Sequence, residues 1–306
     1  MATASSLDTP DGDRSGPLLM VAASGAFTAM ITLVELARAW GFDTTELIGW
    51  RVLGAIPALY LVTGADWRVN RWGLLAVRCG FGFCAMFCFF SATAGLGVGE
   101  LTVVTKLQPI FVAILAPLAL GRAERPGPPE LLALALGILG TFCLVWPDLD
   151  VDGTAGAPGT LARGTALAIG IAAAGFSACA HTTLRALGKT ESPAAIVFWF
   201  QLSVGAAVLV GLTLGPAVAH VPGGGNLPVL LGIGIAAVLG QLWMTRAYRI
   251  ARAARVAAAS YVSPLMGFTV DALVFGTLPT WWTTAGAVLV VAAGGVLLAG
   301  NPRESA

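Results

Sequence analysis

Four ionisable side chains stand inside long apolar runs of the chain. Two are acids, Glu35 and Asp271, and two are bases, Arg51 and Lys106. An ionisable group in hydrocarbon is costly unless it is paired or hydrated, so each of the four is a candidate for function. Two acids and two bases at one depth could neutralise each other, or they could bind the two ends of a zwitterion. For Glu35 and Arg51 the alternative is a structural ion pair or snorkelling to the outer interface.

Two apolar runs collect polar and aromatic residues on one face. In the run 255–275, the residues that recur every three or four positions, and so share a face of a helix, are Tyr261, Pro264, Phe268, Asp271 and Phe275. The corresponding set in the run 101–120 is Lys106, Pro109, Ala113 and Pro117. Each face combines apolar surface with a charge, which suits the wall of a solute pathway.

Pro109 and Pro264 lie in the middle of these two runs. A proline frees a carbonyl one turn back and weakens the helix, so each predicts a kink and a polar backbone site within the membrane. The polar side chains that flank the prolines, and could satisfy these carbonyls or contact solute, are Thr105, Gln108, Ser260 and Ser263. The alternative is that the prolines only shape the bundle.

Other polar groups in apolar runs are weaker candidates. Gln201, Gln241 and His181 are the kind of residue that more often forms an interhelical hydrogen bond than binds a ligand, although Gln241 stays on the pathway. The unperturbed pKa of a histidine lies near neutral pH, which would permit proton coupling by His181, but its predicted place is nearer the cytoplasmic end. Any proton coupling is expected to use Glu35 or Asp271, and exchange of one solute for another is the alternative.

The composition identifies the elements that must position these residues. The chain has 306 residues, of which 57% are hydrophobic and 11% charged, and its mean hydropathy of +0.84 excludes a water-soluble globular domain. A helix needs about 20 apolar residues to cross a bilayer, and the alternation of a barrel strand is absent. We expect an all-α integral membrane protein of ten transmembrane helices, at 18–37, 46–63, 73–94, 101–120, 130–146, 163–184, 194–213, 227–247, 255–275 and 281–299.

Several classes of function are disfavoured. The formal net charge is +1, so no strong field would attract nucleic acid. All five cysteines lie in apolar runs without a CxxC pair or a histidine cluster, so we expect no disulfide, no metal and no cofactor. A membrane-embedded enzyme is an alternative to a transporter, but only two histidines are present, His181 and His220, on opposite predicted sides. A non-transporting membrane partner or sensor is the other alternative.

The distribution of Lys and Arg predicts the orientation, because translocating cationic loops is disfavoured. With an even number of spans both termini lie on one side. If that side is the cytoplasm, the outer segments hold only Arg38 and Arg163, while the inner segments hold Arg14, Arg68, Arg71, Arg78, Arg122, Arg125, Arg185, Lys189, Arg246, Arg249, Arg252, Arg255 and Arg303. We interpret the arginines at 246–255 as a solvated cytoplasmic face. The prediction is a multi-pass protein of the inner or plasma membrane with both termini cytoplasmic.

The two halves of the chain resemble each other. A shift of 155 residues, the spacing from Pro109 to Pro264, also superposes Ala92 on Ala247, Leu118 on Leu273, Gly121 on Gly276 and Gly140 on Gly295. Because each copy has an odd number of helices, consecutive copies must be inverted, a recurring arrangement in secondary transporters. We expect a disordered tail at 1–17, repeats at 18–147 and 163–299, an outer loop at 148–162 and a tail at 300–306.

Two segments carry a resemblance to a known family. They are FSATAGLGVGELTVVTKLQPIFVAILAPLALGR at 90–122 and TRAYRIARAARVAAASYVSPLMGFTVDALVFG at 245–276. Each resembles the EamA family of the drug/metabolite transporter superfamily in having a short helix, a small-residue turn, and a helix with a mid-span proline and a late glycine. The acidic residue that often follows that glycine is displaced, because Arg122 follows Gly121 and Thr277 follows Gly276, with Glu124 further on.

The resemblance covers nearly all of 18–299 and implies a ten-helix inner-membrane carrier, commonly an exporter of amino acids or other small metabolites. It also implies a central cavity lined partly by the fourth and ninth helices. We therefore expect a secondary exporter or exchanger of an amino acid or related amphiphilic solute, with membrane lipid as the other partner and a homodimer left open. The residues expected along the pathway are Glu35, Arg51, Lys106, Gln108, Pro109, Gln241, Tyr261, Ser263, Pro264, Phe268 and Asp271.

Overall fold

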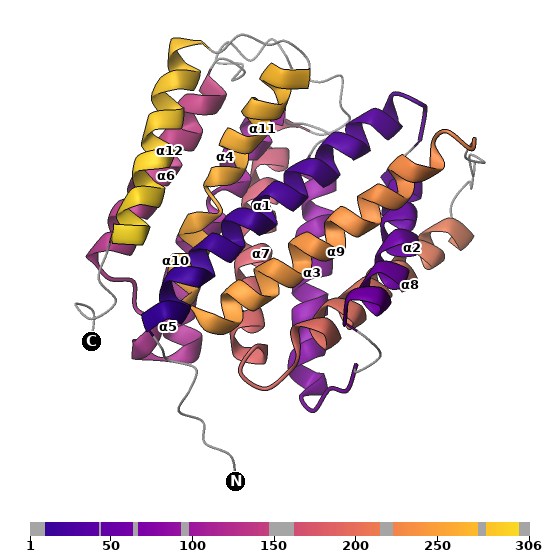
Figure 1. Ribbon diagram of the computed structural model, residues 1–306, viewed down its shortest axis with the longest axis horizontal. Coiled ribbons are helices and arrows are strands. Elements are labelled where there is room, and N and C mark those ends of the chain that lie inside the picture. Colours follow the sequence, from indigo (N-terminus) through magenta and orange to yellow (C-terminus); the bar gives the residue numbers. More distant parts are fainter. Residues whose placement is uncertain are drawn as a thin grey trace.

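The computed structural model describes residues 10–42, 44–63, 67–92, 98–146, 162–214, 223–274 and 280–299. In this part of the chain every regular element is a helix (Figure 1). The helices are α1 (Pro10–Arg38), α2 (Thr44–Thr63), α3 (Trp72–Ala92), α4 (Val98–Thr105), α5 (Gln108–Leu120), a 3-10 turn η1 (Arg122–Glu124), α6 (Pro128–Val145), α7 (Arg163–Leu187), α8 (Pro193–Leu214), α9 (Leu227–Ile250), α10 (Ala253–Ala259), α11 (Val262–Val274) and α12 (Trp281–Ala299).

These helices make ten crossings, because α4 with α5 and α10 with α11 each form one interrupted crossing. Eight segments are long and apolar enough to span a membrane by themselves, and the other two crossings are α2 and the α10–α11 pair. The first carries Glu46 and Arg51, and the second is interrupted and holds Arg255. The structure therefore confirms the predicted all-α membrane fold. The helix α1 begins at Pro10, earlier than expected, and residues 1–9, 147–161 and 300–306 of the predicted tails and loop lie outside the described part.

Both ends of the described bundle lie beside one segment. Near the start of α1, Gly16 packs against Ala251 in the link between α9 and α10. Near the end of α12, the backbone oxygen of Leu297 accepts a hydrogen bond from Arg255. The first and last crossings thus share one end of the molecule with the arginine-rich segment 246–255, here called the inner end. Such an arrangement requires an even number of crossings.

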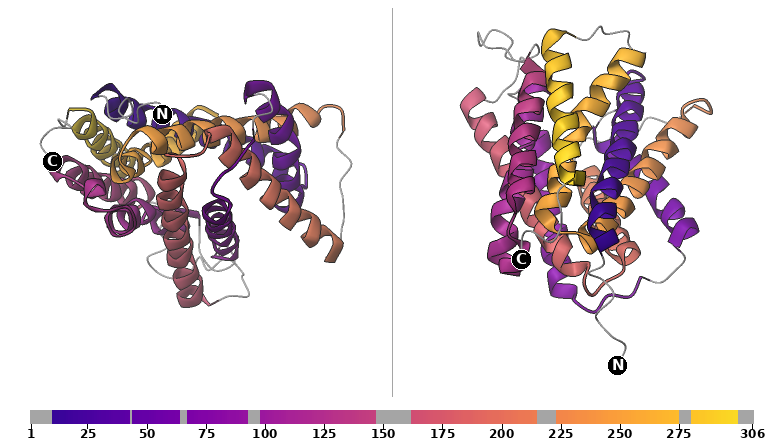
Figure 2. Two further views of the ribbon diagram at one scale, coloured as in Figure 1. Left: turned by 90° about the horizontal axis from the view of Figure 1, so that it is seen from below. Right: turned by 60° about the vertical axis from the view of Figure 1, so that its left-hand side comes forward.

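The helices pack as pairs that join the two halves of the chain. The most extensive contacts are α1 with α9, α3 with α7, and α6 with α12, and α6 and α12 run side by side at one edge of the bundle (Figures 1 and 2). In a duplicated chain α1 corresponds to α7, α3 to α9 and α6 to α12. The pair α1–α9 is therefore equivalent to the pair α7–α3, and the pair α6–α12 is equivalent to itself. This pattern is the one that inverted repeats produce.

Glycines let two pairs of helices, α2 with α9 and α6 with α12, approach closely. A Cβ on Gly54 of α2 would lie 2.7 Å from the Leu231 backbone oxygen in α9, and one on Gly286 of α12 would lie 2.7 Å from the Gly140 oxygen in α6. Small residues of this kind let helix backbones approach in a membrane, where dispersion contacts replace the hydrophobic effect. A side chain at either position would push the paired helices apart.

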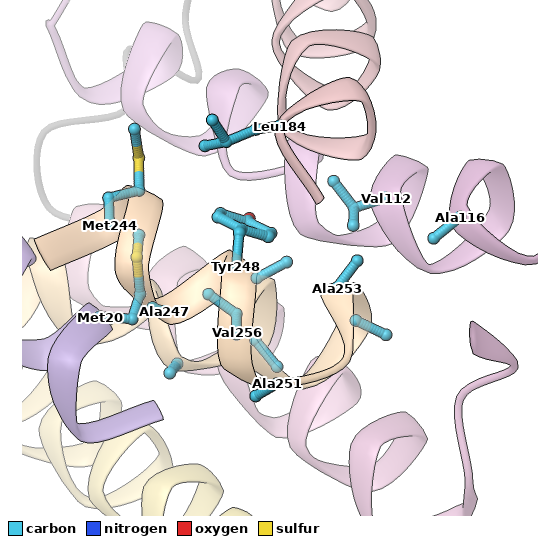
Figure 3. Packing of buried hydrophobic residues seen from close by; sticks show 14 of the residues in the cluster. Met20, Val112, Ala116, Leu184, Met244, Ala247, Tyr248, Ala251, Ala253 and Val256 are labelled. Atoms are coloured by element: carbon cyan, nitrogen blue, oxygen red, sulfur yellow. The ribbon is translucent and has the colours of Figure 1, made fainter. Parts of the chain in front are cut away.

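The largest buried apolar cluster lies toward the inner end, where α5, α7, α9 and α10 meet (Figure 3). Tyr248 is fully buried at its centre, and the side chains of Leu184, Val112 and Val256 lie around it. Five of the seven residues of α10 are alanines, so apart from Arg255 and Val256 only methyl side chains lie between this helix and its neighbours. The two halves are therefore tightly packed at this end.

Candidate functional site

Both broken crossings are interrupted at corresponding positions. The helix α4 ends at Thr105 and α5 begins at Gln108, while α10 ends at Ala259 and α11 begins at Val262. At each break the backbone makes tighter three-residue turns, with Lys106 N donating to Val103 O at 3.1 Å and Ser260 N donating to Ala257 O at 3.0 Å. The breaks precede Pro109 and Pro264, so the kinks lie where these prolines predict them.

The two breaks are joined to each other by side chains. Lys106 Nζ donates to the backbone oxygen of Ser260 at 3.2 Å, and the Tyr261 hydroxyl donates to the backbone oxygen of Lys106 at 2.9 Å. The Ser260 oxygen stands four residues before Pro264, so it is the carbonyl that this proline frees. Ser263 Oγ donates to the same oxygen at 2.8 Å. A polar junction therefore lies inside the membrane region, between the two halves.

A cavity of about 280 Å³ opens beside this junction. The described residues that line it come from both halves and comprise Met20, Ser24, Phe27, Arg78, Gly82, Ala85, Lys106, Gln108, Ser177, Ala180, His181, Phe200, Gln241, Met244, Ser260 and Ser263. Two of them, Arg78 and Lys106, carry a positive charge, and none of these lining residues is an acid. The cavity wall is therefore cationic over the described part of the chain.

Arg78 is the most deeply buried charge on this wall, at 3% exposed. Its guanidinium carbon lies 4.5 Å from the centre of the Phe200 ring, which is a cation–π contact. Its Nε and Nη1 atoms have no hydrogen-bond partner among the described residues. Gly82, one turn further along α3, makes room for it, since a Cβ there would lie 2.5 Å from Nη1.

His181 contributes a further polar group to the cavity. Its Nδ1 lies 2.9 Å from Gln108 Nε2, and its ring stacks on Tyr248 with centroids 5.1 Å apart. Because an amide NH₂ group only donates, Nδ1 accepts, and the neutral ring carries its proton on Nε2. The sequence places His181 away from the charged group, whereas the structure places it in the same cavity as Lys106.

The structure brings together part of the predicted pathway. Lys106, Gln108, Gln241 and Ser263 line the cavity. Pro109 and Pro264 are buried beside the breaks, where they shape the helices. The remaining predictions lie elsewhere or beyond the described side chains.

Tyr261 stands in the second break, but its ring lies against Gly137 of α6 and only its hydroxyl reaches the junction. Phe268 packs with Leu144, Val145 and Val290 instead of lining the cavity. Arg51 is half-buried in α2 and is not among the residues that line the cavity. The side chains of Glu35 and Asp271 lie outside the described residues.

The sequence analysis did not predict Arg78 as a site residue. It counted Arg78 among the cytoplasmic charges that set the topology, and this assignment is wrong. It stands six residues inside α3 and is buried at the cavity. The rule that singles out Lys106, an ionisable residue within an apolar span, applies equally to Arg78. Arg78 lies close to residue 73, the predicted start of the span, and Arg71 directly precedes that start. Arg78 therefore resembled a charge that flanks the membrane.

The inner end contains charges of a different kind. Glu124, 3% exposed, accepts from Arg185 Nε at 2.8 Å and from the Ala253 backbone N–H at 2.9 Å. Arg185 also donates to the backbone oxygens of Tyr248 and Arg249, at 3.1 and 2.8 Å. Every one of these groups meets a buried partner, and the Glu124 contacts join the first half of the chain to the second.

A second set of contacts joins the halves beside the first. Glu130, at the start of α6, accepts from Arg252 at 2.9 Å and lies 3.8 Å from Arg255. The Arg255 side chain is 1% exposed. The interpretation of these arginines as a solvated face is therefore wrong for Arg252 and Arg255, because buried Glu130 pairs with both. Arg246 is exposed and fits that interpretation.

Ten crossings as inverted repeats, with two interrupted helices meeting at a polar cavity, define the class of secondary-transporter folds. The comparison with family models places residues 14–146 in the EamA-like transporter family. Human solute carrier family 35 member G1 is 30% identical over 255 residues, which cover 79% of this chain and 67% of that protein. The chain belongs to the EamA family of the drug/metabolite transporter superfamily.

Other relatives agree with this membership. The pseudopaline exporter CntI of Pseudomonas aeruginosa is 29% identical over 92% of this chain and 94% of its own length. A riboflavin transporter of Rhizobium johnstonii is 25% identical over 91% of this chain and 89% of its own. A solved crystal structure matches the fold with a TM-score of 0.75 at 18% identity, over 93% of this chain and 96% of its own. The relatives are transporters, so the chain is a multi-pass membrane transporter and not an enzyme.

Proposed function

We propose that the chain is a secondary exporter or exchanger of a small metabolite, such as an amino acid or a related amphiphilic solute, in the inner or plasma membrane. The observation that carries this proposal is the cavity of about 280 Å³ at the junction of the two broken helices. Both halves line it, and a solute bound there would contact each repeat. Two of the named relatives carry different solutes in their names, pseudopaline and riboflavin, and the third name gives none, so the relatives support transport without naming the cargo.

The packing supports alternating access as the mechanism. The half-helices near the inner end, α5 and α10, pack against each other, whereas α4 packs on α7 and α6, and α11 packs on α1, α12 and α6. The ion pairs of Glu124 and Glu130 close the same end. We propose that this conformation is closed at the inner end, that the inner end faces the cytoplasm with both termini, and that transport requires these pairs to separate. The repeats 18–147 and 163–299 would be the bodies that move.

Reconstitution tests the proposal. Proteoliposomes containing the purified protein should take up at least one solute from a broad metabolite panel, in a saturable manner, above the level of protein-free vesicles. Repeating the assay with and without a pH gradient separates proton coupling from exchange, which instead requires solute loaded on the opposite side. Absence of solute-dependent flux across the panel would favour a membrane partner or sensor over a transporter.

Topology is tested independently by cysteine labelling. A cysteine introduced at Arg68 or Arg246, both of which are exposed, should react with a membrane-impermeant reagent only after the cytoplasmic side is exposed, in a background from which the five native cysteines are removed. Labelling of either position from outside would contradict the proposed orientation.

A further inference from the structure

We propose that the central cavity selects a small organic anion, whose carboxylate or phosphate oxygens are received by Arg78 and Lys106. This inference rests on the proposed transport function, and it narrows that function to acidic solutes. It also replaces the expectation of a zwitterion held between acids and bases, because the charged residues of the described wall, Arg78 and Lys106, are both bases.

The charge balance of the wall is the first argument. Arg78 and Lys106 line one cavity, and the other described lining residues are uncharged, if the neutral His181 is counted with them. A buried cation without a counter-ion is costly, and removal of that cost by an anionic ligand contributes to binding. A cationic solute would be repelled by Arg78 and Lys106, and a neutral solute would leave their charges uncompensated.

The supply of unused hydrogen-bond donors is the second argument. Arg78 has Nε and Nη1 without partners among the described residues, and an arginine has five N–H donors. Within the described part of the chain, Lys106 donates one hydrogen bond, to the Ser260 oxygen at 3.2 Å, which leaves two of its three donors. Charge-assisted hydrogen bonds to carboxylate or phosphate oxygens are about twice as strong as neutral ones. These donors therefore match the chemistry of an oxyanion.

The surroundings hold Arg78 in place for such a ligand. Phe200 lies against its guanidinium at 4.5 Å, and Gly82 leaves the space into which it extends. On other parts of the wall, Met20, Phe27 and Met244 present apolar surface. The cavity thus offers a charged site for an acidic group and an apolar surface for the carbon skeleton of the same solute.

The test is uptake from a defined mixture. Proteoliposomes are incubated with amino acids, di- and tricarboxylic acids, sugar phosphates, neutral sugars and polyamines, and their contents are identified by mass spectrometry. We expect net-anionic solutes to accumulate above the protein-free level, and the carboxylate and phosphate classes of the mixture show which acid is used. In Arg78→Met, which removes the charge at similar length, uptake should fall by at least about tenfold, the effect of losing one charge-assisted contact.

Two further variants make the result specific. Arg246→Gln removes an arginine that is exposed on α9 and outside the cavity, so its uptake should match that of the unchanged chain. Lys106→Met leaves Arg78 in place and should also reduce uptake of the same anion, which keeps the test valid if Arg78→Met does not fold.

The outcomes separate the two proposals. Accumulation of zwitterionic, neutral or cationic solutes alone, or anion uptake that survives both Arg78→Met and Lys106→Met, would overturn the anion inference and leave transport standing. If no solute of any class accumulates, the proposed function fails and the inference fails with it.

Discussion

Two regions of the molecule bury arginine in opposite ways. At the inner end, Arg185 donates to Glu124 and to two backbone oxygens, so its charge is fully compensated within the protein. At the central cavity, Arg78 rests on Phe200 and has two nitrogen atoms without a partner among the described residues. Both arginines are largely shielded from solvent: the Arg185 side chain is 12% exposed, and Arg78 as a whole residue is 3% exposed. The difference between them is the partner and not the burial.

The difference separates structural charges from ligand-binding charges. Removing one member of a buried pair leaves the other charge uncompensated, which destabilises the fold. Removing a buried charge that has no partner leaves nothing orphaned, so its loss should affect function more than folding. Mutations at the two arginines should therefore have opposite signatures.

The largest expected effect is on stability at the inner end. Arg185→Met leaves the buried Glu124 carboxylate with only the Ala253 N–H as a partner among the described residues, and should lower the free energy of unfolding by about 3–5 kcal/mol. The measurement is a titration with denaturing detergent in mixed micelles. Adding Glu124→Leu to this variant should recover part of the loss, because the orphaned carboxylate is removed. A double variant less stable than Arg185→Met would contradict the account of this pair.

The next effect is the opposite signature at Arg78. In Arg78→Met we expect thermal unfolding in detergent at or above the temperature of the unchanged chain, together with the loss of anion uptake described above. Stability and uptake are measured on the same preparation. If Arg78→Met destabilises the protein as much as Arg185→Met does, both arginines have a structural role and the proposed difference between them is wrong.

A smaller effect is expected when Arg78 is displaced but kept. A Cβ on Gly82 would lie 2.5 Å from Nη1 and 2.8 Å from the Phe200 ring, so Gly82→Ala should push the guanidinium away from its position. We expect the half-saturating concentration of the transported anion to rise roughly fivefold, about 1 kcal/mol. Gly80→Ala on the same helix is the control, since a Cβ there meets nothing within 4 Å. Equal values for the two variants would show that Arg78 is not held by this packing.

The smallest effect is expected at the neutral link between the breaks. Tyr261→Phe removes the hydrogen bond from the hydroxyl to the Lys106 oxygen, a loss of about 0.5–1.5 kcal/mol in unfolding free energy. The ring and its packing against Gly137 remain. Uptake should fall far less than in Lys106→Met. A loss of uptake as large as that of Lys106→Met would assign Tyr261 to the solute.

The sequence predicts most of this fold because lipid imposes few solutions. Continuous apolar runs bounded by charges, glycine and proline give the ten crossings, and the prolines at 109 and 264 mark the interruptions. These signals are local, so they can be read from one chain. The shift that relates the two prolines also places the breaks 106–107 and 260–261 within one residue of each other.

The site is less predictable because its contacts are not local. Glu124 and Arg185 are separated by 61 residues and Lys106 and Ser260 by 154, so no helical periodicity relates them. Arg78 and Arg255 both lie near arginine-rich span ends, where the same residue type either fixes topology or is buried. Burial and pairing, which depend on the packed bundle, decide between these roles.

An electron cryomicroscopy structure of the protein in lipid, with the accumulated solute bound, would show directly which side chains bind the solute. We predict an oxyanion within hydrogen-bond distance of both the Arg78 guanidinium and the Lys106 ammonium group, in the cavity between the two broken helices. A carboxylate of the chain itself against Arg78, with the solute bound elsewhere, would contradict it.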